Sequence, residues 1–94
     1  MKVNIKKITD SSLIPTRGSV DAAGYDLYAD IHPKTEGEIP PGTTVKIGTG
    51  IAMEIPKGYA GFIYARSGIA TKKGLRPANC VGVVDADYRG EIIV

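Results

Sequence analysis

The chain has almost none of the residues on which metal and thiol chemistry most often depends. Its 94 residues include one cysteine, Cys80, one histidine, His32, and no tryptophan. A single cysteine excludes an internal disulfide, and a single histidine excludes a zinc cluster and a histidine-containing catalytic dyad at a core site. Because Cys80 stands in an apolar stretch, we expect a buried, inert thiol within a strand rather than a nucleophile, in a reducing cytoplasmic setting.

Long apolar runs and an excess of charge of one sign are also absent. Twelve basic residues stand against ten acidic ones, for a net charge of +2, which is too balanced to indicate a nucleic-acid surface. No stretch approaches the roughly 18 to 20 apolar residues of a membrane span, and the first residues lack the apolar core of a signal peptide. We expect a soluble, unprocessed single domain over residues 1–94, small enough that oligomerisation is a reasonable source of stability.

Glycine and proline divide the chain into short segments with the periodicity of strands. Residues 45–55 alternate apolar side chains with polar or small ones, which predicts a strand with one solvated face. Gly48 and Gly50, on its non-core side, indicate a bulge or bend where another backbone passes closely, rather than a phosphate loop. Further strands are expected over residues 3–8, 24–29, 59–64 and 81–84, and the turn at residues 56–58 predicts a hairpin between strands 45–55 and 59–64.

The remaining residues predict loops and one helix. Residues 11–20 read as an extended crossing loop, and residues 30–42, rich in proline and charge, as a surface excursion. Residues 67–74 predict a short helix with Ser67 as its N-cap, lysines in its last turn and Gly74 as its stop. Short strands punctuated by glycine and proline indicate an all-β sandwich or barrel.

The segment best suited to chemistry follows the last apolar run, in which a buried strand over 81–84 would end in acidic residues. Strand alternation puts Asp85 and Asp87 on one side, and Ala86 and Tyr88 on the other, unless the turn has already begun. One acid could act as a base while Arg89 holds its neighbour. An ordinary polar hairpin turn explains the same residues equally well, since Asp and Gly favour turns for local reasons.

A second segment, Arg66-Ser67-Gly68, precedes the expected helix. Amide groups at a helix start, a hydroxyl and a guanidinium all suit phosphate oxygens, and glycine lets a ligand approach the backbone. Taken alone, the segment is better explained by a surface arginine beside a serine cap.

Read together, three segments resemble, in order and spacing, the first three motifs of the trimeric deoxyuridine triphosphatases. They are residues 22–27, residues 65–68 with 73–74, and residues 79–90. The resemblance extends over nearly the whole chain. It implies a distorted jelly-roll fold of the β-clip type and a homotrimer with active sites at subunit boundaries. It also implies Mg²⁺-dependent hydrolysis of dUTP to dUMP and pyrophosphate, which limits uracil in DNA and supplies dUMP for dTMP synthesis.

The resemblance also implies the roles of the residues that would touch the substrate. Asp85 would orient and deprotonate the attacking water and meet the sugar 3′-hydroxyl, and Tyr88 would pack against the deoxyribose, where a 2′-hydroxyl would clash. Asn79 would hydrogen-bond the uracil. The phosphates would be bound by Arg66, Ser67 and Gly68.

Three other residues would support this site. Asp26 would support the metal or the phosphate-binding arginine indirectly, without being a metal ligand itself. Asp87 and Arg89 would form a supporting pair. Mg²⁺ would take its ligands from substrate phosphates and water, with no direct protein ligand.

The sequence departs from the family pattern in two places. Ala65 stands where the family usually has proline, and the sequence ends at residues 92–94, before the fourth and fifth motifs. We expect a truncated dUTPase lacking its final strands and C-terminal tail. Two alternatives are a non-catalytic module that binds nucleotide or forms oligomers, and a relative of the dCTP deaminases. Residues 85–88 fit the dUTPase motif better than the deaminase one.

Overall fold

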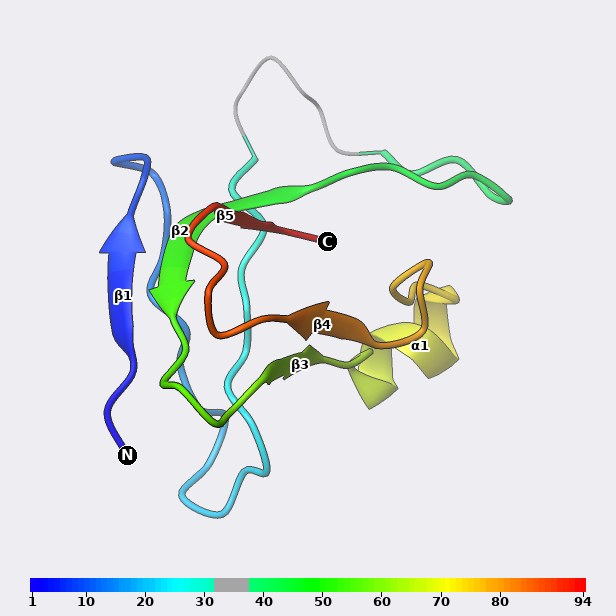
Figure 1. Ribbon diagram of the computed structural model, residues 1–94. Helices are drawn as coiled ribbons and strands as arrows, with labels where there is room; N and C mark the ends of the chain where they lie inside the picture. The colour runs from blue at the N-terminus through cyan, green and yellow to red at the C-terminus, as the bar shows by residue number, and fades with distance from the viewer. Residues whose placement is uncertain (32–37) are drawn as a thin grey trace. The chain divides into compact units, whose positions relative to one another are not determined.

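The computed structural model describes residues 1–31 and 38–94. The described part contains five strands and one helix (Figure 1): β1 (Asn4–Lys7), β2 (Gly48–Glu54), β3 (Gly61–Ile63), α1 (Ser67–Lys73), β4 (Gly82–Val84) and β5 (Glu91–Ile93). The mostly β structure confirms the predicted fold class. Two compact units form, one from Met1–Asn4 with Glu54–Tyr88 and the other from Ile5–Met53 with Arg89–Val94. His32 and most of the expected surface excursion lie outside the described residues.

The second of these units is organised around β2, which lies between β1 and β5 in a three-stranded sheet. The antiparallel register with β5 shifts between Gly48 and Ala52, and Gly50 within this shift has a φ of 69°. The predicted bulge is therefore confirmed. The predicted solvated face is wrong, because Thr49, Gly50, Ile51 and Ala52 are all buried: the bulge breaks the alternation, and neighbouring segments cover both faces.

A cluster of polar side chains, the Asp30 cluster, covers this bulge. The Asp30 carboxylate accepts hydrogen bonds from Thr9 Oγ1 and Ser11 Oγ, each at 2.6 Å. The buried Ser12 donates to the Thr9 carbonyl at 2.8 Å, and the Ile8 amide donates to the Gly50 carbonyl at 2.7 Å. The cluster ties the loop after β1 to the central strand through hydrogen-bonded polar groups, of which Ser12 is buried.

The strand expected over residues 24–29 does not form, so this prediction is wrong. The structure has one isolated antiparallel bridge there, between Thr16 and Asp26. Between these two residues the chain turns at 19–22, where the Ala22 amide donates to the Ser19 carbonyl at 3.2 Å. The Arg17 guanidinium donates to the Ala22 carbonyl at 2.6 Å. Local hydrogen bonds from side chains and turns thus replace the hydrogen-bond ladder of a strand. Residues 11–20 are otherwise irregular, as predicted.

In the other unit, β3 and β4 form an antiparallel pair with Gly61 opposite Val84 and Ile63 opposite Gly82. The predicted hairpin between β2 and the strand after it is wrong, although the turn itself forms: the Tyr59 amide donates to the Pro56 carbonyl at 3.1 Å. Because β1 and β5 occupy both edges of β2, β3 pairs with β4 instead. The strand over 81–84 is buried on one face only, since Val83 is 61% exposed.

Helix α1 follows β3 closely. Its N-cap residue is Arg66, with φ −87° and ψ 134° and no side-chain capping bond, so the prediction that Ser67 is the cap is wrong. The predicted stop is confirmed: Gly74 has a φ of 65°, its amide bonds back to the last turn, and Lys72 and Lys73 stand in that turn. In the described part of the chain, no helix has the length and apolar character that crossing a membrane requires.

Candidate active site

Arg66, Ser67 and Gly68 lie where β3 gives way to α1, and all three are exposed. The Arg66 carbonyl accepts the first intrahelical bond, from the Ala70 amide at 2.9 Å. The amides of the first helical turn have no partner inside the helix, as at every helix start. A Cβ added to Gly68 would meet no atom within 4 Å. The segment therefore combines a guanidinium, a hydroxyl and an accessible backbone, which suits an anionic group.

Asn79 lies in the turn that leads into β4. Its Nδ2 atom is 3.5 Å from the position that a Cβ on Gly82 would occupy, so the carboxamide packs over the first residue of the strand. Cys80 beside it is exposed, with a φ of 65°. The prediction of a buried thiol within a strand is therefore wrong: residues 77–80 form a turn, and β4 begins only at Gly82.

Asp85 directly follows β4 and begins a tight turn. The Tyr88 amide donates to the Asp85 carbonyl at 3.1 Å, so the strand alternation does not continue through Ala86 and Asp87. Asp at the first position is favoured in a type I turn, and neither central residue has a positive φ. The turn leaves the side chains of Asp85, Asp87 and Tyr88 exposed, so both acids and the aromatic ring are accessible to a ligand.

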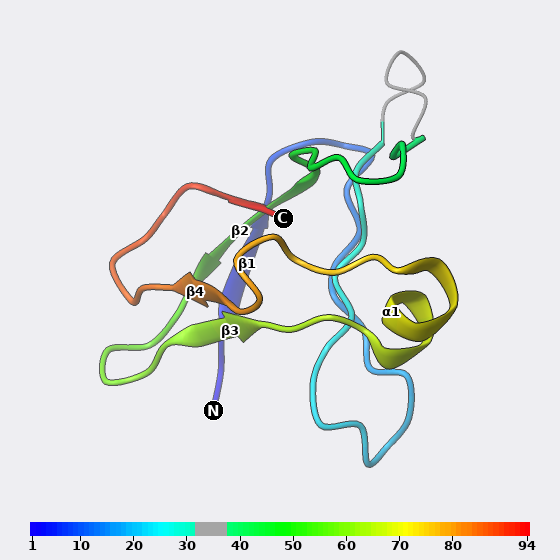
Figure 2. The same cartoon turned by 90° about the vertical axis from the view of Figure 1, so that its right-hand side faces the viewer.

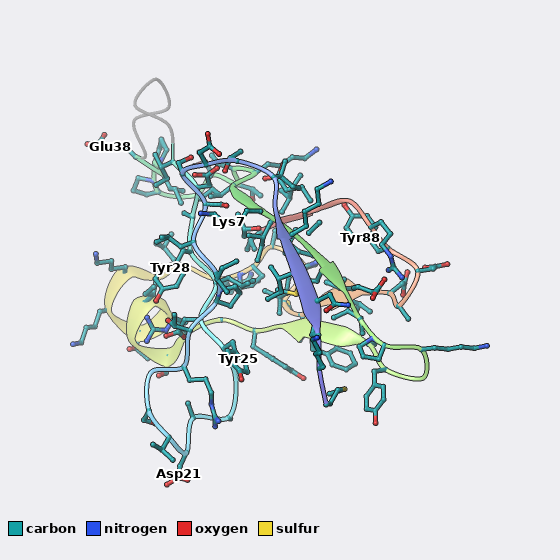
Figure 3. The ribbon with its side chains drawn as sticks, turned by 90° about the vertical axis from the view of Figure 1, so that its left-hand side faces the viewer. Lys7, Asp21, Tyr25, Tyr28, Glu38 and Tyr88 are labelled. Carbon is teal, nitrogen blue, oxygen red and sulfur yellow. The ribbon has the colours of Figure 1, made fainter. Side chains whose placement is uncertain are left out.

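The β3–β4 pair separates these residues into two groups. Arg66 comes three residues after Ile63, and Asn79 comes three residues before Gly82; because Ile63 pairs with Gly82, both lie at the α1 end (Figure 2). Asp85 follows Val84 at the opposite end. Figure 3 shows Tyr88 on the loop beyond that end, away from α1. The structure thus brings the Arg66 segment and Asn79 to one end of the pair, and Asp85, Asp87 and Tyr88 to the other.

Two predicted supporting residues belong to the other compact unit. Asp26 is half-buried and forms the bridge with Thr16 through its backbone. Arg89 is exposed and begins the segment that leads to β5. Within residues 1–31 and 38–94, no three His, Cys, Asp or Glu side chains gather as a group that could hold a metal ion.

One residue near Asn79, Arg76, has a role that the sequence did not indicate. Arg76 Nη1 donates to the Pro77 carbonyl at 3.2 Å and to Cys80 Sγ at 3.6 Å, so it braces the turn that carries Asn79. The only sequence signal is its position directly before Pro77, which is too common a pattern to single out the residue.

Comparison with known proteins identifies the family. The family model described as dUTPase matches residues 10–94. Among curated proteins, a deoxyuridine 5′-triphosphate nucleotidohydrolase from Desulfitobacterium hafniense is 51% identical over 82 residues, which are 86% of this chain and 53% of that protein. The enzyme of the same name from Nautilia profundicola is 46% identical over all 94 residues, which match 63% of its length.

Solved structures show the same relationship. The dUTPase of Staphylococcus bacteriophage 80alpha with dUpNHpp has a TM-score of 0.82 and 28% identity, covering 98% of this chain and 51% of that chain. A variant dUTPase from phage phi11 of S. aureus, which coordinates a structural Mg(II) ion, has a TM-score of 0.77 and 26% identity, covering 99% and 57%. This chain spans between about half and three-fifths of the length of these relatives. The resemblance found in the three motifs is confirmed: the chain belongs to the dUTPase family.

Proposed function

We propose that the protein hydrolyses dUTP to dUMP and pyrophosphate, with active sites shared between the subunits of a homotrimer. The observation that carries this proposal is the arrangement along β4, with a carboxamide at its start and a carboxylate and a tyrosine just beyond its end. Family membership supplies the substrate class, because the curated relatives are named as nucleotidohydrolases of this nucleotide. The expected cytoplasmic location and role in limiting uracil in DNA stay predictions.

Recognition of the base would use Asn79 and the backbone of β4. In the described part of the chain, β4 pairs only with β3, so its second edge can offer amides and carbonyls to the edge of a uracil ring. A methyl group on thymine would press against the strand wall. Cytosine would present a donor where uracil presents an acceptor, and leaving buried polar groups unpaired costs more than losing an apolar contact.

Asp85 would align the attacking water with phosphorus and meet the sugar 3′-hydroxyl. Its position at the first residue of a hydrogen-bonded turn fixes the backbone, and the residue is exposed. A carboxylate is a weak base, yet it is sufficient for phosphoryl transfer when cations carry the charge that develops on the phosphate oxygens.

The separation of the two groups of residues supports the shared site. A nucleotide with its base at Asn79 and its sugar at Tyr88 would lie along β4 and point its phosphates away from the α1 end. Arg66, Ser67 and Gly68 of the same chain lie at that α1 end. The phosphates would therefore be bound by this segment of another subunit, and the supporting roles of Asp26, Asp87 and Arg89 would be completed in the same assembly.

The donor set suits magnesium that arrives with the substrate. The described residues bring no three acidic or histidine side chains together, and Mg²⁺ readily keeps water and phosphate oxygens as most of its ligands. The ion would neutralise phosphate charge when bound, and Asp26 is the acidic residue proposed to support it indirectly.

The Tyr88 ring is proposed to distinguish deoxyribose from ribose. Replacing Tyr88 by alanine removes the surface against which a 2′-hydroxyl would clash, so the preference for dUTP over UTP should fall by about tenfold or more. The measurement is kcat/KM for both nucleotides. Tyr88→Phe keeps the ring and should keep the preference, and unchanged selectivity in the alanine variant would remove Tyr88 from the sugar pocket.

The proposed activity is tested by pyrophosphate release from dUTP, dCTP, dTTP and UTP with Mg²⁺. Release from dUTP alone would support the proposal. Equal release from all four would contradict recognition through Asn79 and β4, and formation of dUTP from dCTP would instead identify a deaminase. Binding of dUTP without release would identify a non-catalytic nucleotide-binding protein.

A further inference from the structure

The turn that carries Asn79 contains an uncommon backbone conformation. Within residues 1–31 and 38–94, Cys80 is the only residue other than glycine with a positive φ, at 65°. The Val81 amide donates to the Asn79 carbonyl at 2.7 Å across it. A hydrogen bond between residues two apart with a positive φ between them defines the rarer, strained form of the γ-turn. Such strain persists only where surrounding structure enforces it, and it concentrates at functional sites.

Contacts on both sides hold this turn. The Cys80 amide donates to the Pro77 carbonyl at 3.1 Å, which closes a second turn immediately before the first. Pro77 is buried, and Arg76 Nη1 donates to the Pro77 carbonyl at 3.2 Å. Two overlapping turns therefore fix the backbone of Asn79, and its side chain is exposed.

The turn also determines where the Asn79 side chain lies. Nδ2 of Asn79 lies 3.5 Å from the position of a Cβ on Gly82, and the chain folds back between the two residues, where the Val81 amide bonds the Asn79 carbonyl. Gly82 is buried and has no side chain that would displace the carboxamide.

We infer that Cys80 is a positioning residue for base recognition, which acts through its backbone conformation and not through its thiol. The inference rests on the proposed function, because it assumes that Asn79 reads the base of dUTP. It extends that function by proposing that Cys80, the strained residue beside Asn79, fixes the orientation of the Asn79 side chain.

The test compares three variants that differ in how well they tolerate a positive φ. A β-branched residue tolerates it worst, so Cys80→Val should open the turn and weaken binding of the non-hydrolysable imido analogue of dUTP by about tenfold or more. Cys80→Ser lacks the thiol but keeps the size, and Cys80→Gly adopts the conformation without strain; both should bind within about threefold of the parent protein. Binding is measured by calorimetry.

Inorganic tripolyphosphate is the matched probe, because it lacks a base. Its affinity should be unchanged in all three variants, whereas general loss of structure in the valine variant would weaken both ligands together. If the valine variant does not fold, the glycine and serine variants still test the inference. Loss of analogue binding in either one would contradict a role of the Cys80 backbone alone.

The outcomes separate this inference from the proposed function. If the parent protein binds no dUTP analogue, the proposed function is wrong and the inference with it. If the parent binds and the valine variant binds equally well, only the inference is overturned.

Discussion

Asp85→Asn is expected to reduce the rate of dUTP hydrolysis by at least about a hundredfold, the lower range for loss of a general base. The amide has the size and turn preference of the carboxylate, and Asp and Asn are both favoured at the first position of a type I turn. The bond from the Tyr88 amide to the backbone carbonyl of residue 85, at 3.1 Å, does not involve the side chain. Affinity for the dUTP analogue should therefore stay within about threefold, a modest change for one weakened contact.

Asp87→Asn is the matched control, because it makes the same chemical change two residues away in the same turn. Asp87 is proposed to support the site and not to touch the water, so this variant should lose less than about tenfold in rate. Single-turnover hydrolysis and calorimetric binding separate the two effects. Equal rate losses in both variants would show that the local charge matters rather than the position of Asp85, and loss of binding with rate in Asp85→Asn would contradict its role.

Gly50→Ala is expected to destabilise the fold by about 2 to 5 kcal/mol, which combines left-handed backbone strain with overpacking. Gly50 has a φ of 69°, and an added Cβ would lie 2.5 Å from Thr9 Oγ1, 2.6 Å from Asp30 Oδ2 and 2.7 Å from Ser12 Cβ. The methyl group would press on the hydrogen bond between Thr9 and Asp30. Because small domains are stable by only about 5 to 15 kcal/mol, this loss would be a large fraction of the total.

Gly42→Ala isolates the strain from the steric contact. Gly42 has a similar φ of 75°, and an added Cβ there would meet nothing within 4 Å, so the cost should be only about 1 to 2 kcal/mol. Urea unfolding gives both values, provided that the dependence on denaturant is unchanged. Similar losses of unfolding free energy in the two variants would show that the Asp30 cluster rearranges to accommodate a methyl group and does not fix the conformation of the bulge.

Local features of the fold could be predicted from the sequence because they depend on neighbouring residues. Gly74 ends α1 since glycine alone adopts a positive φ without strain. Gly48 and Gly50 indicated a bulge for a similar reason, and the bulge is there. For the site, the order and spacing of the three motifs identified the family, although no single motif would have done so.

Long-range pairing could not be predicted in the same way. The turn at residues 56–58 indicated a hairpin between β2 and β3, but the partners of β2 are β1 and β5, which come from distant parts of the chain. The exposure of Cys80 also depended on context, because apolar neighbours suggested a strand while the Pro77 turn delays β4 until Gly82. Positive φ at a cysteine has no sequence signature, so the strained turn beside Asn79 emerged only from the structure.

The most direct test of dUTP hydrolysis follows the phosphorus signals of dUTP in the presence of the protein and Mg²⁺ by ³¹P NMR. The proposed reaction predicts that the triphosphate signals disappear while dUMP and pyrophosphate appear in equal amounts. Persistence of intact dUTP, or its conversion to dUDP and orthophosphate, would contradict it.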